Sequence, residues 1–185
     1  MSLKPWIVND QKTIFESPRI SIYNETITLP DGRIIDDYIQ VDMPEHAVML
    51  VKNAVGKWLL QRQYKHGPRA VSLTFPAGQL NSGELPLEAA KRELREETGL
   101  ECDDWSFLGS YVVNGNQRCG CAHLFHAQCL TATELPVESD NQDLEEQEIV
   151  WLSDLELLEA FRVGQFMISS HALAFTIAIN PALRP

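Results

Sequence analysis

Residues Gly78–Leu100 read GQLNSGELPLEAAKRELREETGL, and the rest of the chain is best interpreted outward from them. They predict a loop followed by one helix, in which Pro86 is tolerated near the first turn and Gly99 forms the C-terminal cap. Glu93 and Glu97 are like charges one turn apart, beside the negative end of the helix dipole. Some other interaction must therefore offset their repulsion.

Three carboxylates lie on one side of the predicted helix. At 3.6 residues per turn, Glu93, Glu96 and Glu97 fall within an arc of roughly 100°, beside an apolar stripe that can pack on a sheet. A solvated acidic face is the common alternative for such a charge run. Converging carboxylates repel one another unless a cation lies among them, and Mg²⁺ accepts carboxylates together with water and phosphate oxygens. The cluster therefore favours a divalent-cation site.

The spacing of this stretch resembles a known family signature. In order, with the intervening residues counted, it reads Gly78, five residues, Glu84, seven residues, Arg92-Glu93-Leu94, one residue, Glu96-Glu97, one residue, Gly99-Leu100. This resembles the signature of the Nudix hydrolases, G-x5-E-x7-R-E-U-x-E-E-x-G-U, where U is a bulky aliphatic residue. All nine specified positions match across 23 residues, which makes coincidence a negligible explanation.

The resemblance implies a fold, a reaction and a metal site. The fold is α/β: a Nudix α/β/α sandwich with a mixed β-sheet, to which a small N-terminal antiparallel β segment is added. The reaction is Mg²⁺- or Mn²⁺-dependent hydrolysis of the pyrophosphate bond of a nucleoside diphosphate linked to another group. By position, Glu93 and Glu97 are the principal metal ligands and Glu96 is a further ligand, while the main-chain carbonyl of Ala77 completes the site.

Other positions of the motif carry supporting roles in the family. Glu84 and Arg92 are expected to fix the loop against the helix, and Gly78 serves the backbone geometry. The general base is either a glutamate of the motif or one in the acidic stretch before the last strand. There Glu145 is favoured and Glu146 follows closely, although charge in a solvated loop is the ordinary alternative for both.

Strand-like segments surround the motif. RISIYNETITL and IIDDYIQV, joined by the turn PDGR, predict an N-terminal hairpin, so that residues 1–42 form a β segment and residues 43–185 the Nudix domain. Further strands are expected in AVMLV, WLLQRQY, AVSLTFPAGQL, WSFLGSYVV, AHLFHAQCL and EIVWL. Two more helices are expected in SDLELLEAFRVG, which starts with a capping box, and in SSHALAFTIAINP. A hairpin is marginal by itself and should pack against the rest of the chain or a second subunit.

Two short segments resemble the ADP-ribose and ADP-sugar pyrophosphatase branch of the family, namely QYK, which ends at Lys65, and FPAGQL. In that branch the N-terminal strands commonly pack between two subunits and help form the nucleotide site, which implies a homodimer. Candidate substrate contacts are the basic residues Lys65, Arg19 and Arg118 and the aromatic residues Trp6, Phe15 and Tyr23. The aromatic residues are more often packing residues.

Two departures from that branch leave the identity of the substrate undecided. A proline that many members carry is absent from VVNGNQ, and Lys65 replaces the more typical arginine, so it acts as a point charge without bidentate geometry. ADP-ribose or another nucleotide sugar is favoured. The alternatives are a dinucleoside polyphosphate, NADH, a capped RNA end, or a Nudix module that binds a nucleotide without cleaving it.

Composition limits the partners. The formal charge of −11 argues against a nucleic-acid surface, because neutralising phosphates needs clustered Lys and Arg. No secretory signal is apparent, and the longest apolar run is too short to span a bilayer, so no membrane partner is expected. The four cysteines favour reduced thiols in a cytoplasm. A zinc site at Cys119, Cys121 and His123 is the weaker alternative, because no second pair of ligands follows.

Overall fold

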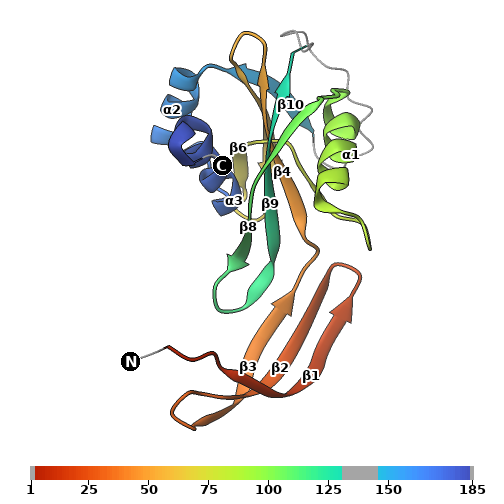
Figure 1. Cartoon of the computed structure of the whole chain (residues 1–185), viewed down its shortest axis with the longest axis vertical. Helices are drawn as coiled ribbons and strands as arrows, with labels where there is room; N and C mark the ends of the chain where they lie inside the picture. The colour runs from red at the N-terminus through yellow and green to blue at the C-terminus, as the bar shows by residue number, and fades with distance from the viewer. Residues whose placement is uncertain (1–2, 131–145, 184–185) are drawn as a thin grey trace. The chain divides into compact units, whose positions relative to one another are not determined.

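The computed structural model describes residues 3–130 and 146–183, and their contacts divide the chain into two units (Figure 1). The first unit holds the residues up to Glu45 and the segment Val112–Cys121, and the second holds His46–Tyr111 and the residues from Ala122 onward. The elements in chain order are β1 (Ile7–Ser17), β2 (Ile20–Thr28), β3 (Ile34–Asp42), β4 (His46–Asn53), β5 (Trp58–Lys65), β6 (Ala70–Thr74), β7 (Ala77–Gln79), α1 (Pro86–Thr98), β8 (Asp104–Asn114), β9 (Arg118–Cys129), β10 (Gln147–Leu152), α2 (Asp154–Arg162), α3 (Ser169–Ile179) and the short 3₁₀ helix η1 (Pro181–Leu183).

The N-terminal unit is built on three antiparallel strands, β1, β2 and β3. The predicted hairpin is β2 and β3, whose turn contains Gly32 with a φ of 87°. β1 lies within the predicted β segment but was not identified as a strand of its own, because almost all of its side chains are exposed and it therefore has no apolar alternation. The start of β9 also joins this unit: Val41 pairs with Arg118, and the Val41 N–H donates to the carbonyl of Gln117 over 3.0 Å.

The second unit contains the predicted mixed sheet. β4 runs parallel to β9, from the His46–Ala122 pair to the Asn53–Cys129 pair. It runs antiparallel to β5 and to the short β7, while β5 is antiparallel to both β6 and β10. The central position of β4 explains its sequence, since residues buried on both faces give the continuous apolar run AVMLV.

Helices cover both faces of this sheet, as the α/β/α prediction requires (Figure 1). Ala90 and Leu94 of α1 are fully buried against one face, in a cluster with Met49 and Phe125. α2 and α3 cover the opposite face, where Phe175 joins the second cluster of buried residues. Because α1 is held by this apolar stripe, its neighbouring acidic side is kept out of the core.

The helix ends follow local chemistry. Gly99 caps α1 in the left-handed region with a φ of 67°, and its N–H donates to the Arg95 carbonyl over 2.8 Å. Ser153 and Glu156 form the predicted capping box of α2. α2 ends at Arg162, two residues before Gly164, where the sequence predicts its end. Among the described residues, no helix has both the length and the apolar character needed to cross a membrane.

Candidate functional site

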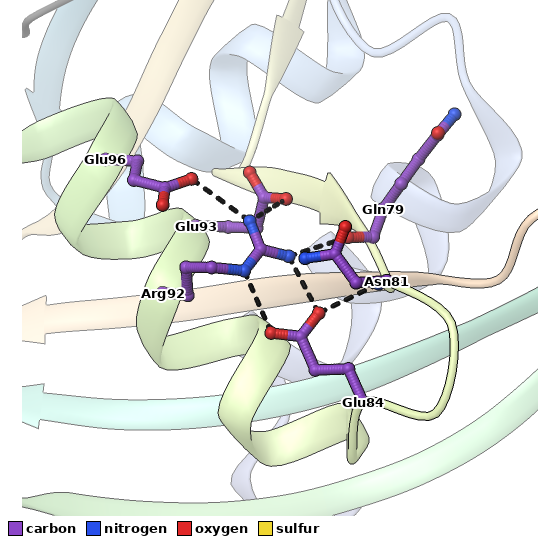
Figure 2. Close-up of polar contacts among 6 residues, drawn as sticks. All are labelled: Gln79, Asn81, Glu84, Arg92, Glu93 and Glu96. Carbon is purple, nitrogen blue, oxygen red and sulfur yellow. Dashed lines mark hydrogen bonds and ion pairs between the residues drawn. The ribbon is translucent and has the colours of Figure 1, made fainter.

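Arg92 is the centre of the polar contacts around α1 (Figure 2). Its Nε and Nη2 donate to the two carboxylate oxygens of Glu84, each over 2.9 Å. Nη2 also donates to the main-chain carbonyl of Gln79 over 3.0 Å, and Glu84 accepts a further hydrogen bond from the Asn81 N–H over 2.8 Å. This bidentate arrangement joins the loop after β7 to the helix.

The charges of this pair stabilise each other. Hydrogen bonds from Arg92, and then from the Asn81 backbone, lower the pKa of Glu84 from 4.5 to about 2. The hydrogen bond to Glu84 raises the pKa of Arg92 above its ordinary value, against the effect of partial burial. Both groups are therefore ionised throughout the neutral range, and the loop anchor does not depend on pH there.

The same guanidinium contacts two glutamates of the acidic cluster. Arg92 Nη1 donates to Glu93 Oε1 over 2.7 Å and to Glu96 Oε2 over 3.0 Å (Figure 2). The side chain of Glu93 is 16% exposed, whereas that of Glu96 is 55% exposed. Glu93 thus lies at the base of the cluster and Glu96 at its rim.

Glu93 packs directly on the backbone of β7. A Cβ added to Gly78 would lie 1.9 Å from Glu93 Cδ, a separation that real atoms do not allow. Gly78 therefore makes room for the carboxylate. This contact brings Glu93 to the strand that contains Ala77, whose carbonyl the motif predicts as a ligand.

Glu97 is held by a residue that the sequence analysis did not identify. Gln61 of β5 donates from Nε2 to Glu97 Oε2 over 3.0 Å. The main-chain carbonyl of Glu97 accepts a hydrogen bond from Gln147 Nε2 of β10 over 3.4 Å. One signal in the sequence could have pointed to Gln61. It is an amide residue that follows the buried run WLL, at a position where the strand could have continued with an apolar residue.

The carboxylate oxygens of this cluster are of the chemical type that a hard divalent cation prefers. Glu93 and Glu97 supply half-buried carboxylate oxygens, and Glu96 supplies a further one at the rim. Over residues 3–130 and 146–183, no three His, Cys, Asp or Glu side chains are arranged as a metal-binding group. Since Arg92 contacts both Glu93 and Glu96, a cation at these oxygens would compete with its guanidinium.

The described candidates for the general base and for a basic substrate contact lie at or beside the ends of the paired strands β5 and β10. Glu145 lies outside the described residues. Glu146 is exposed immediately before β10 and lines a pocket of about 550 Å³ together with Arg62 and Tyr64. Lys65 is half-buried at the end of β5. The roles of these residues stay predictions.

The remaining candidate substrate contacts belong to the N-terminal unit. The exposed Trp6 packs edge-on against Tyr38 with 5.7 Å between ring centroids, beside a pocket of about 390 Å³. Arg118 forms ion pairs with Asp42 at 3.6 Å and with Glu45 at 3.4 Å.

Three further candidates lie in the same unit. Tyr23 and Arg118 line one pocket of about 240 Å³. Arg19 is exposed in the turn between β1 and β2, and Phe15 is exposed on β1. Whether these residues meet a nucleotide stays a prediction.

The residues of the alternative zinc site make other contacts. Cys119 and Cys121 do not belong to a disulfide, and His123 Nδ1 lies 2.7 Å from the hydroxyl of Ser110. His126 packs edge-on against Trp58, with 5.9 Å between ring centroids. Each of the two histidines thus has a partner within the fold.

Comparisons with known proteins agree on the family of this chain. The model of the NUDIX domain family matches residues 43–169. An ADP-ribose pyrophosphatase of Bacillus subtilis (strain 168) is 28% identical over 153 residues, which cover 83% of this chain and 80% of that protein. A methanol dehydrogenase activator of Bacillus methanolicus is 30% identical over 149 residues, which cover 80% of this chain and 77% of that protein.

Among solved structures, the crystal structure of an ADP compounds hydrolase superposes with a TM-score of 0.77. The match covers 96% of this chain and 94% of the other, at 20% sequence identity. At that identity the likeness supports the α/β fold alone.

Proposed function

The chain belongs to the NUDIX family of hydrolases, which act on pyrophosphate bonds, and from this premise we propose that it cleaves ADP-ribose or a related nucleotide sugar with the help of Mg²⁺ or Mn²⁺. The products are a nucleoside monophosphate and a sugar phosphate. The observation that carries the proposal is the placement of two half-buried carboxylates, with Glu93 on the backbone of Gly78 and Glu97 on Gln61. The similarity to an ADP-ribose pyrophosphatase supports the choice of substrate.

The metal would be held mainly by Glu93 and Glu97, with Glu96 and the carbonyl of Ala77 as further ligands. When bound, a divalent cation polarises the phosphoryl oxygens, stabilises the leaving phosphate and activates a water molecule. Arg92, which is itself anchored by Glu84, donates to Glu93 Oε1 and Glu96 Oε2, and a bound cation would compete with it for those two oxygens.

The charge balance of the protein supports a cation at this site. A chain with a formal charge of −11 repels a diphosphate over long distances. A divalent ion on the carboxylate cluster reverses the sign of the local field, so the diphosphate is attracted where the bond is to be cleaved.

Further parts of the proposal rest on the sequence and the family resemblance. Either Glu145 or Glu146 acts as the general base, because both precede the last strand in the acidic stretch. Residues 1–42 take part in a homodimer and supply nucleotide contacts. The cysteine content favours a cytoplasmic location.

The test is product analysis with a panel of substrates. ADP-ribose with Mg²⁺ should give AMP and ribose phosphate, and chelation of the metal should stop the reaction. NADH and dinucleoside polyphosphates in the same panel test the alternative substrates. Faster cleavage of one of these compounds than of every nucleotide sugar would contradict the proposed substrate. Failure to cleave any compound of the panel would contradict the proposed hydrolase activity.

Glu97→Gln tests the role of the cluster. It removes one charge from the cluster and should lower turnover by roughly 10²-fold or more, while the fold is retained. The matched control is Glu88→Gln on the same helix, because Glu88 occupies an unspecified position of the motif. Among the ion pairs of the described residues it forms only one, with Lys91 at 3.9 Å. Turnover of Glu97→Gln equal to that of the control would rule out the assigned role.

A further inference from the structure

A chain of buried polar side chains leads from the sheet to the carboxylate of Glu97. Gln61 is completely buried, yet its amide nitrogen donates to Glu97 Oε2 over 3.0 Å. An amide buried without partners destabilises a fold, so this side chain is stable in the core only because both ends are hydrogen-bonded.

Two further buried residues set the orientation of that amide. Gln63 Nε2 donates to Gln61 Oε1 over 3.3 Å and to Thr74 Oγ1 over 2.8 Å. The Thr74 hydroxyl in turn donates to the main-chain carbonyl of Gln61 over 3.3 Å. Because Oε1 of Gln61 accepts from Gln63, its Nε2 is turned toward Glu97 and not away from it.

Gln61 is a neutral donor to Glu97, whereas Arg92, which donates to the other two glutamates, is a cation. Arg92 brings a full positive charge to Glu93 and Glu96, and so it competes with any metal ion for those oxygens. An amide orients a carboxylate without neutralising it. The hydrogen bond from Gln61 therefore holds the Glu97 rotamer without adding a positive charge that would compete with a cation.

We propose that Gln61 is a positioning residue for Glu97, and that Gln63 and Thr74 hold the Gln61 amide in the orientation that this requires. The inference rests on the proposed function, since it assigns to Glu97 the divalent cation of that reaction. It extends the site by three residues of β5 and β6 that lie outside the motif. Partners of metal ligands commonly change metal affinity or activity by about 10- to 100-fold when they are lost.

The test compares Gln61→Leu with Thr74→Val and with a control. Gln61→Leu removes the donor at similar size, so kcat and Mn²⁺ affinity, measured by electron paramagnetic resonance, should fall roughly 10- to 100-fold. The KM for ADP-ribose should stay close to that of the wild type, because Gln61 is proposed to act through the metal ligand Glu97 and not through the nucleotide. Thr74→Val is nearly isosteric and removes both the acceptor for Gln63 and the hydrogen bond to the Gln61 carbonyl, but it leaves the Gln61 amide in place, so it should produce a smaller loss in the same two quantities.

Gln128→Leu is the matched control. Gln128 is a half-buried amide on β9 whose Nε2 donates to the main-chain carbonyl of Asn53 over 3.3 Å. It should bind Mn²⁺ and turn over ADP-ribose like the wild type. If Gln61→Leu is too unstable to purify, Thr74→Val against this control decides the question.

Two outcomes separate this inference from the proposed function. Mn²⁺ affinity and kcat of Gln61→Leu and Thr74→Val equal to those of the control would overturn the inference, although the wild type is an active pyrophosphatase. A wild type that cleaves no nucleotide sugar would contradict the proposed function instead. In that case the Mn²⁺ affinities of the same variants still test the link from Gln61 to Glu97.

Discussion

The Cα of Gly78 lies against the carboxylate of Glu93, so that an added Cβ would come within 2.2 Å of both Cγ and Oε2 of the glutamate. The φ of Gly78 lies outside the left-handed region, so glycine is required here by close contact and not by backbone conformation. The side chain of a proposed metal ligand on the helix thus packs directly on the bare backbone of the strand.

We expect Gly78→Ala to displace Glu93. Turnover and Mn²⁺ affinity should fall roughly 10- to 100-fold, and the added methyl should destabilise the fold by about 1–3 kcal/mol. Steady-state kinetics, Mn²⁺ titration and thermal unfolding measure these effects. Gly67→Ala is the control, because a Cβ at Gly67 meets no atom within 4 Å. Full activity of Gly78→Ala would show that Glu93 is not needed in this position.

Arg92→Lys should separate charge from geometry. Lysine keeps the charge but cannot bond both oxygens of Glu84 at once. Since the arginine lowers the folded-state pKa of Glu84 from 4.5 to about 2, its stabilising effect is present above about pH 4.5 and is lost as the pH falls through about 2. In the variant this pKa should rise toward 4.5, so the effect is lost at a higher pH.

Carboxyl titration by NMR measures the pKa of Glu84 in both proteins. The control is Arg62→Lys, because Arg62 bonds an exposed carboxylate, that of Glu148, over 2.8 Å. An unchanged titration of Glu84 in Arg92→Lys would contradict the explanation given for its low pKa.

His171 should make the stability of the fold depend on pH. Burial, with smaller effects from His46 and Lys65, lowers its pKa from 6.5 to about 3, and its Nδ1 accepts a hydrogen bond from the Phe75 N–H over 3.2 Å. Because the folded-state pKa lies below that of the unfolded chain, the fold loses stability as the pH falls from about 6.5 toward 3. The loss reaches at most about 1.4 kcal/mol per pH unit for this one proton.

His171→Asn keeps an acceptor near the position of Nδ1 but does not titrate, so it should remove this part of the slope. Urea unfolding at several pH values measures how the free energy of unfolding depends on pH. His66→Asn is the control, because His66 is exposed. Equal slopes for His171→Asn and the wild type would mean that His171 does not carry the effect.

The proposed homodimer can be tested by one substitution on β1. Ile14 is 57% exposed on this outer strand, so Ile14→Asp should convert a dimer to a monomer and weaken nucleotide binding. Light scattering with size-exclusion chromatography measures the mass. Val55→Asp is the control, because Val55 is 72% exposed in the turn after β4. A dimer that tolerates Ile14→Asp while the wild type is also a dimer would place the interface elsewhere.

A point substitution is preferable to removing residues 1–42. Val41 pairs with Arg118, and its N–H donates to the Gln117 carbonyl. The truncation would therefore also remove the backbone partner of Gln117 and Arg118. Loss of binding after the truncation would then have two explanations, whereas Ile14→Asp leaves these pairs intact.

The elements of the second unit could be predicted because their signals are local. The left-handed cap at Gly99, the capping box at Ser153 and the apolar stripe that includes Leu94 each depend on residues within a turn or two. The contact between Glu84 and Arg92 was expected from the family spacing, and the structure contains it. β1 was missed for the same reason, since an exposed strand carries no local apolar pattern.

By itself the sequence determined the family, the helix that carries the glutamates and the arginine among them, because helical periodicity and motif spacing are local properties. Only the tertiary structure decided what holds each carboxylate. Glu97 and Gln61 are hydrogen-bonded although they are 36 residues apart in the sequence, and His171 and the Phe75 N–H are hydrogen-bonded although they are 96 residues apart. Such partners depend on which strands and helices pack side by side, and a buried polar group accepts whichever donor that packing brings within reach.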